Sequence, residues 1–246
     1  MSSSRLRTVA GFVILFLLYQ SSEAIGARLL HNNVLAASLM AAAFIAAWPV
    51  GRGLGYKGFD AYALSLKWPA LRLLTGGLLL MGAVRLAAVF WGLNSGVYAI
   101  GTPAPAHVLA LPLVLLGAAL TTFIPSVAED ILTRGFWLEA ARIRWAGWSF
   151  ILATSLIYVL NHVFHLADPL EWIRLFCFGL AYATAAWKWR SLWAAVGLHW
   201  GWNLSNALLD IFITLNNTGP AVWLSAGAHL VTAAIIWLWP KPNDTI

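Results

Sequence analysis

The sequence predicts an all-α fold, a polytopic membrane helix bundle of about eight transmembrane helices. Of the 246 residues, 61% are hydrophobic and 10% are charged, whereas soluble domains average about 25% charged residues. The hydrophobic residues are gathered into runs long enough for a helix to cross a bilayer, which takes about 20 residues. No linker or internal repeat divides the chain, so we interpret residues 1–246 as a single integral membrane domain.

Eight apolar runs mark the expected helices. They cover residues 8–25, 34–50, 68–93, 107–140, 147–166, 171–187, 191–211 and 221–239. The first follows Arg5 and Arg7 without a small-residue cleavage site, so we interpret it as a retained span rather than a signal peptide. The fourth is too long for one straight crossing, and its Pro125 lacks the N–H that an interior residue of a helix donates. We therefore expect a kink at Pro125 and an irregular turn before Glu129, inside the bundle.

The positions of the basic residues predict the orientation in the membrane. With the first residue inside, the outer loops contain only Arg28 and Arg174. The inner loops then contain Arg5, Arg7, Arg52, Lys57, Lys67, Arg142, Arg144, Lys188, Arg190 and Lys241. Because inner loops of membrane proteins are rich in Lys and Arg, this bias places both termini in the cytoplasm. The same topology accounts for the net charge of +6, so no nucleic-acid partner is predicted, and the single cysteine excludes an internal disulfide.

Three polar clusters interrupt the apolar runs in the second half of the chain. An ionisable side chain in hydrocarbon costs about 3 kcal/mol or more, so such groups usually pair or do chemistry. In the first cluster, Asp130 and Arg134 are four residues apart and would face each other on a helix as an ion pair. Glu129 is rotated by about 100° from Asp130, so it can point into a cavity and act as a general base toward water. The alternative is that all three residues form one structural ion-pair network.

The second cluster contains Tyr158, His162 and His165. The two histidines are three residues apart and share a helix face, with Tyr158 one turn before His162. We interpret the deeper His162 as a site residue that binds water or a metal, or stabilises an oxyanion. His165 is interpreted as structural, near the outer end of its span, donating to the backbone or to Asp168.

The third cluster pairs His199 with Asn203, four residues later on the same helix face. Gly201 between them allows another helix or a substrate to come close. An imidazole and a carboxamide can stabilise an oxyanion through donated hydrogen bonds; the alternative for Asn203 is a cross-link between helices. Asn206 can join the same face, and Asp210 is interpreted as part of a solvated helix end.

The order and spacing of these clusters resemble a known family. An acidic pair followed by Arg, an aromatic residue four before His, and His four before Asn or Asp are similar to the motifs of the CPBP family of intramembrane proteases. That family includes the type II CAAX prenyl proteases and bacterial relatives tied to bacteriocin processing and immunity. The resemblance covers roughly residues 107–210, which we take as a catalytic core. It implies a multi-pass protein of the bacterial inner or plasma membrane whose partners are the lipid bilayer and a membrane-anchored protein or peptide substrate.

The resemblance implies catalytic roles for four residues. Glu129 corresponds to the glutamate that activates the attacking water. His162 corresponds to the residue that binds or polarises this water. His199 and Asn203 correspond to the pair that stabilises the tetrahedral oxyanion.

The resemblance also implies structural support from Asp130, Arg134 and Tyr158, and here the sequence departs from the family twice. The family most often has Glu where Asp130 stands, and Phe where Tyr158 stands. Asp130 still reaches Arg134, and Tyr158 still packs as an aromatic ring. We therefore expect the catalytic set to remain complete.

The expected function is that of an intramembrane endopeptidase of the glutamic type, without a resident cofactor or metal. Two His and a Glu would also suit zinc with one open position, but no H-E-x-x-H motif is present and Asn is a poor zinc ligand. A second class is a CPBP-like scaffold or immunity protein that binds without cutting. A third is a transporter with a proton relay, although transporters often have repeated halves. The sequence leaves open the oligomeric state and the substrate: a prenylated tail, a bacteriocin leader or a C-terminal sorting tail.

Overall fold

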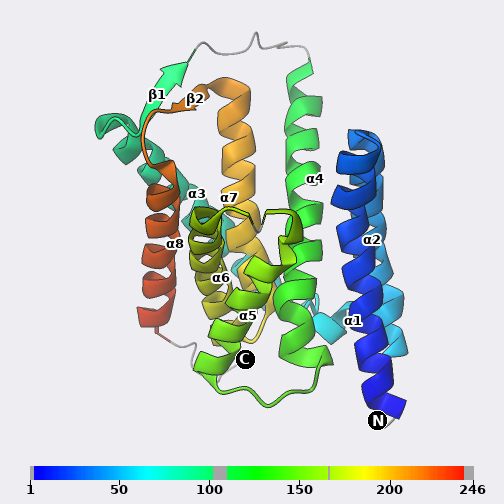
Figure 1. The fold of residues 1–246 in the computed structure, drawn as a ribbon. Coiled ribbons are helices and arrows are strands. Elements are labelled where there is room, and N and C mark those ends of the chain that lie inside the picture. The colour runs from blue at the N-terminus through cyan, green and yellow to red at the C-terminus, as the bar shows by residue number, and fades with distance from the viewer. Residues whose placement is uncertain (1–2, 102–109, 166, 241–246) are drawn as a thin grey trace.

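The computed structural model describes residues 3–101, 110–165 and 167–240. Over these residues, eight α-helices run alongside one another in an up-and-down bundle (Figure 1). They are α1 (Ser3–Ser21), α2 (Asn33–Gly53), α3 (Trp68–Asn94), α4 (Leu111–Asp130), α5 (Gly147–Asn161), α6 (Pro169–Trp189), α7 (Leu192–Phe212) and α8 (Ala221–Leu238). Each predicted apolar run overlaps one of them, so the all-α membrane bundle is confirmed. Residues 107–109 of the fourth run and Lys241 lie outside the described residues.

Short elements extend or join these helices. The π-helices η1 (Ser22–Leu29) and η4 (Ile131–Ala140) continue α1 and α4, and short 3₁₀ turns are η2 (Gly58–Tyr62) and η5 (Val163–His165). Two strands, β1 (Tyr98–Gly101) and β2 (Thr214–Asn217), pair antiparallel. The sequence did not predict them, because four residues are too few to show a strand period. This small sheet ties the segment after α3 to the segment after α7.

The helices of the bundle differ in whether they are long and apolar enough to cross a membrane by themselves. Five helical segments are long and apolar enough to cross a membrane: Ser4–Leu29, Asn33–Gly53, Trp68–Asn94, Leu111–Ala140 and Ala221–Leu238. α5 is apolar but has only 15 residues, while α6 and α7 contain the largest sets of buried residues. The chain is a multi-pass membrane protein, but the predicted count of eight crossings is not confirmed.

The acidic cluster lies where the fourth helix changes its winding. α4 runs through Pro125 without interruption, and the π-helix Ile131–Ala140 follows it directly. The predicted irregular turn before Glu129 is therefore wrong, since the irregular winding begins after the acidic pair. The kink at Pro125 stays a prediction. The Ser126 hydroxyl donates to the carbonyl of Thr122 within this helix at 2.7 Å. π-helical turns are rare and occur frequently at functional sites.

α5 and α6 form a hairpin whose turn lies about halfway along α4 (Figure 1). α5 ends at Asn161, short of the predicted residue 166, and the η5 turn follows. The two helices approach closely because Gly179 of α6 has no side chain. A Cβ atom there would lie 2.7 Å from the Cα atom of Ser155 on α5. The hairpin therefore brings the end of α5 into the middle of the bundle.

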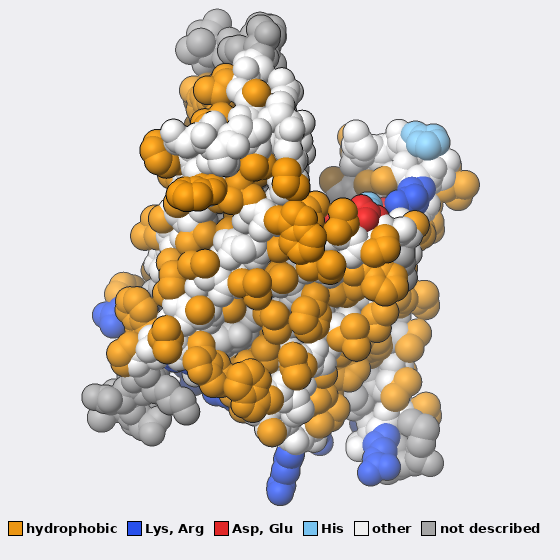
Figure 2. Space-filling model, turned by 60° about the vertical axis from the view of Figure 1, so that its left-hand side comes forward, with side chains coloured by type: hydrophobic (Ala, Val, Ile, Leu, Met, Phe, Trp, Pro, Cys, Tyr) orange, Lys and Arg blue, Asp and Glu red, His pale blue; other side chains and the backbone are white. Residues whose placement is uncertain are grey.

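The surface agrees with a protein embedded in lipid. Figure 2 shows hydrophobic side chains over most of the displayed face, with most of the visible Lys and Arg side chains toward its lower end. α1 begins and α8 ends at the lower end in Figure 1. The basic end is thus the end where α1 begins and α8 ends, as the positive-inside rule requires of a cytoplasmic side. The cytoplasmic placement itself stays a prediction.

Candidate active site

Glu129 lies in the last turn of α4, with 6% of its surface exposed. Each of its two carboxylate oxygens faces an imidazole. Oε1 lies 3.4 Å from Nε2 of His162, and Oε2 lies 3.6 Å from Nε2 of His199. The structure thus brings together three of the four predicted catalytic side chains, from α4, the end of α5, and α7.

His162 caps the C-terminal end of α5 rather than lying inside the helix. Its Nδ1 lies 2.8 Å from the carbonyl oxygen of Tyr158. Since a carbonyl can only accept, Nδ1 carries a proton, and in the neutral ring Nε2 keeps its lone pair toward Glu129. The side chain of His162 is 22% exposed, against 5% for His199. His162 therefore lies on the more accessible side of the site.

His165 points away from the site. Its Nε2 lies 3.3 Å from Oε1 of Glu23 in η1, and its side chain is half exposed. The predicted contact with Asp168 is wrong, because the Asp168 carboxylate caps α6 by accepting from the backbone N–H of Leu170 at 2.9 Å. His165 instead connects the α5–α6 turn to the end of the first span.

His199 is held tightly inside the bundle. Its ring stacks on that of Tyr182 with centroids 4.9 Å apart and an interplanar angle of 18°. Nδ1 lies 3.5 Å from Oδ1 of Asp130, while Nε2 faces Glu129. Because both nitrogens face carboxylates and one face of the ring is covered, the orientation of the imidazole is fixed.

Asp130 and Arg134 form an ion pair across the junction of α4 and η4, and both side chains are fully buried. The guanidinium group lies over two aromatic rings, 4.5 Å from the centroid of Tyr158 and 5.1 Å from that of Tyr182. These cation–π contacts are strongest where the cation is desolvated, as here. With Arg134 paired to Asp130, the carboxylate of Glu129 faces the two histidines.

Asn203 bonds to α4 rather than to Glu129. Its Nδ2 donates to the Oγ atom of Ser126 at 3.1 Å, and Ser126 lies three residues before Glu129. The amide therefore joins α7 to α4 beside the site, one helical turn from His199. This is the cross-link that the sequence leaves open as an alternative.

Three residues that the sequence analysis did not single out surround Glu129. Asn161 donates through Nδ2 to Oε1 of Glu129 at 3.2 Å. Gln20 of α1 donates through Nε2 to the backbone carbonyl of Asn161 at 2.7 Å and to its side-chain oxygen at 3.1 Å. Tyr19 interacts with both Glu129 and Asn161. A polar Gln inside an apolar run was the available signal, because such residues usually face the bundle interior.

Another buried histidine supports the site from behind. His229 of α8 is fully buried, with Nδ1 2.8 Å from the carbonyl of Ser225 and Nε2 2.9 Å from the hydroxyl of Tyr182. Because the carbonyl keeps a proton on Nδ1, Nε2 accepts from the Tyr182 hydroxyl when the ring is neutral. This bond orients the Tyr182 ring that covers His199.

Asn206 also has a partner outside the site. Its Oδ1 accepts from Nε of Arg85 at 2.7 Å. The buried Arg85 further donates to the hydroxyl of Tyr98 at 3.3 Å, and its guanidinium carbon lies 5.0 Å from the centroid of the Trp202 ring. Asn206 lies two turns after His199 on the continuous helix α7, where its amide helps to satisfy a buried cation.

The site agrees with a comparison of the chain with known families. A family model described as type II CAAX prenyl endopeptidase Rce1-like matches residues 110–205. The CPBP resemblance is thereby confirmed. The matched segment contains Glu129 and the residues that face it from α5 and α7, whereas Gln20 and His229 come from outside it. The match supports a protease function of the CAAX type. Neither the curated proteins nor the solved structures gave a match.

The candidate site has two imidazoles and a carboxylate, which are donor types that zinc accepts. In the part of the chain that the structure describes, no group of three or more His, Cys, Asp or Glu side chains is placed to hold a metal ion. His162 and His199 each face a different oxygen of Glu129. The imidazoles thus lie against separate oxygens of the carboxylate.

Proposed function

We propose that this protein is an intramembrane endopeptidase that hydrolyses a peptide bond of a membrane-associated protein or tail. The observation that carries the proposal is the buried carboxylate of Glu129 with an imidazole at each oxygen. The match of the surrounding segment to CAAX prenyl endopeptidases supports the reaction class. The site belongs to a protein of the bacterial inner or plasma membrane with both termini in the cytoplasm.

In the proposed reaction, Glu129 is the general base. The attacking water binds where Oε1 of Glu129 faces the Nε2 lone pair of His162, since the 3.4 Å between these atoms is longer than an ordinary hydrogen bond. Asn161 donates to the same oxygen and orients the carboxylate. Glu129 takes a proton from the water as it attacks the scissile carbonyl, and later returns it to the leaving amine. No covalent enzyme intermediate forms.

His199 and Asn203 stabilise the tetrahedral oxyanion in this proposal. They lie one turn apart on α7, and both can donate through a side-chain nitrogen. Asn203 exchanges its bond with Ser126 for a bond to the oxyanion. One such donor typically contributes about 2.7–4 kcal/mol to the transition state. The rings and the ion pair behind His199 keep its donor in place before the charge develops.

The test compares the wild type with Glu129→Gln in a reconstituted bilayer. The substrates are peptides with a prenylated tail, a bacteriocin-type leader or an apolar sorting tail. Because removing a general base typically lowers a rate by about 10²–10⁴-fold, we expect Glu129→Gln to lose cleavage to this extent. The matched control is Glu139→Gln, which changes an exposed Glu 3.8 Å from Arg190 and should leave the rate unchanged.

Three further outcomes separate the alternatives. Cleavage by Glu129→Gln at the wild-type rate would show that the catalytic assignment is wrong. Cleavage that a chelator abolishes and zinc restores would replace the metal-free mechanism with a zinc mechanism. Binding of a tail peptide without cleavage by the wild type would favour a scaffold or immunity protein.

A further inference from the structure

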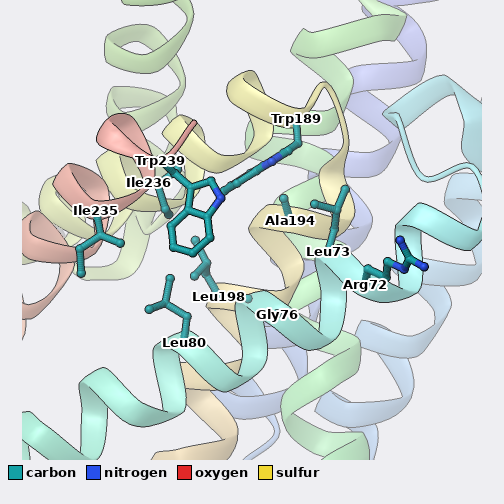
Figure 3. Close-up of a pocket in the computed structure, with 11 residues that line it drawn as sticks. Arg72, Leu73, Gly76, Leu80, Trp189, Ala194, Leu198, Ile235, Ile236 and Trp239 are labelled. Carbon is teal, nitrogen blue, oxygen red and sulfur yellow. The ribbon is translucent and has the colours of Figure 1, made fainter. Parts of the chain in front are cut away.

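A groove separate from the candidate active site opens between α3, α7 and α8 (Figure 3). It encloses a cavity of about 320 Å³ at the end of the bundle where α3 begins and α8 ends. Leu198 lines it, whereas the next residue, His199, points to Glu129 from another face of α7. In Figure 3, the side chains of Leu80, Leu198 and Trp239 project toward the open space, and Arg72 lies at its edge.

Two adjacent glycines of α3 explain why the groove exists. A Cβ atom at Gly77 would lie 2.9 Å from the backbone nitrogen of Leu198, so this glycine lets α3 pack directly on α7. A Cβ atom at Gly76, which lines the groove, would meet nothing within 4 Å. One glycine therefore brings the helices together, and the other leaves room beside the contact.

The walls of the groove are mostly apolar, so a hydrocarbon chain bound there would meet few polar groups. Apart from Arg72, its lining side chains are aliphatic or Trp, among them Leu80, Leu198 and Ile235. Carbonyl groups at the end of α8 already accept hydrogen bonds. Nζ of Lys188 donates to the carbonyl oxygen of Ile236 at 2.5 Å and to that of Trp237 at 3.0 Å. An apolar chain can fill such a groove without leaving buried backbone groups unsatisfied.

Arg72 gives the groove a positive rim. Its side chain is exposed, and its guanidinium carbon lies 5.5 Å from the centroid of the Trp68 ring. In residues 3–101, 110–165 and 167–240, no Asp or Glu lies within ion-pair distance of it. Trp189 and Trp239 also line the groove, and Trp side chains are enriched where a helix meets the lipid headgroups.

We infer that this groove binds an anionic phospholipid, with one acyl chain in the groove and the headgroup phosphate at Arg72. The apolar walls select a hydrocarbon chain, and the unpaired guanidinium selects a negative headgroup over a neutral one. The basic end of the bundle is the side that the positive-inside rule assigns to the cytoplasm, whose leaflet carries the anionic lipids. The inference does not depend on the proposed peptidase activity.

The test counts lipids bound to the full-length protein by native mass spectrometry, with phosphatidylglycerol or phosphatidylcholine of identical acyl chains added to the micelles. We expect the wild type to bind phosphatidylglycerol more tightly. Arg72→Gln should lower this affinity by about fivefold, the factor expected for one basic residue at an anionic surface, and leave phosphatidylcholine binding unchanged. Gly76→Leu, which fills the groove, should weaken binding of both lipids.

Matched controls decide whether these effects belong to the groove. Arg144→Gln removes an exposed basic residue outside the groove lining, and Gly117→Leu fills another helical site where a Cβ atom meets nothing within 4 Å. Both should bind lipid like the wild type. Equal phosphatidylglycerol binding by Arg72→Gln and the wild type would overturn the headgroup assignment. Undiminished binding of both lipids by Gly76→Leu would overturn the groove as the site of the acyl chain.

Discussion

At the scale of single residues, the ion pair of Asp130 and Arg134 depends on both of its members. Both side chains are fully buried in the bundle. Removing one partner of a buried pair typically costs about 3–5 kcal/mol, because the other charge is left uncompensated. The cation–π contacts of Arg134 with Tyr158 and Tyr182 cannot replace a full negative charge.

We therefore expect Asp130→Asn to lower the free energy of unfolding by about 3–5 kcal/mol, measured by denaturation in mixed micelles. The control is Glu171→Gln in α6, whose pair with Arg174 is partly exposed, so its loss should cost about 1 kcal/mol or less. The double variant Asp130→Asn with Arg134→Gln should recover part of the stability. A loss as small as that of Glu171→Gln would show that the buried pair does not stabilise the fold.

The ionisable side chains of the candidate site could be predicted from the sequence, but the residues that hold them could not. Glu129, His162 and His199 are ionisable groups in apolar runs, so the cost of placing them there already marks them. Asn161 and Gln20 are uncharged, and their role at the site depends on a hydrogen bond between two residues that are 141 positions apart in the sequence. No local pattern encodes such a contact. The partner of His165 was mispredicted for the same reason, since Glu23 is remote in sequence.

At the scale of helices, the α5–α6 hairpin is held together by the absence of a side chain at Gly179. An added Cβ atom would lie 2.7 Å from the backbone of Ser155 and would force the helices apart. Overpacking of this kind typically costs about 1–3 kcal/mol. The same hairpin carries His162 at the end of α5 and Tyr182 on α6, so a shift between its helices reaches the candidate site.

Gly179→Ala should therefore lower the melting temperature, and Gly117→Ala should raise it. Gly117 lies in α4, where a Cβ atom meets nothing within 4 Å, and replacing an unstrained helical Gly by Ala gains about 0.5–1 kcal/mol. Thermal unfolding of both variants in the same detergent measures the contrast. If Gly179→Ala stabilised the protein as much as Gly117→Ala does, the tight hairpin contact would be wrong.

The long apolar runs of the sequence predicted that these helices exist, but they did not predict where each helix ends or where its winding becomes irregular. The fifth run was extended to residue 166 because Val163 and Phe164 continue the apolar pattern, although α5 ends at Asn161. Pro125 led us to expect an irregular turn before Glu129 that the structure lacks, since α4 continues as an α-helix to Asp130. The π-helix after Asp130 leaves no comparable mark in the sequence.

At the scale of the whole molecule, the number of membrane crossings decides where the two ends of the chain lie. Five segments are long and apolar enough to cross by themselves, and an odd number would place the ends on opposite sides. In Figure 1, however, α1 begins and α8 ends at the same end of the bundle. The buried helices α6 and α7 can cross inside the protein, because their polar side chains then avoid the lipid.

We therefore expect an even number of crossings, with both ends of the chain in the cytoplasm. Green fluorescent protein or alkaline phosphatase fused to either end should report the cytoplasm, because the basic residues gather at that end of the bundle. A fusion truncated after Ser95, which follows α3, should report the opposite side and serves as the control. Reporters on opposite sides would show an odd number of crossings, so that one of the helices α5 to α7 does not traverse the bilayer. If both reporters lay outside the cytoplasm, the number of crossings would still be even, but the orientation would be reversed. The groove at Arg72 would then take its lipid from the opposite leaflet.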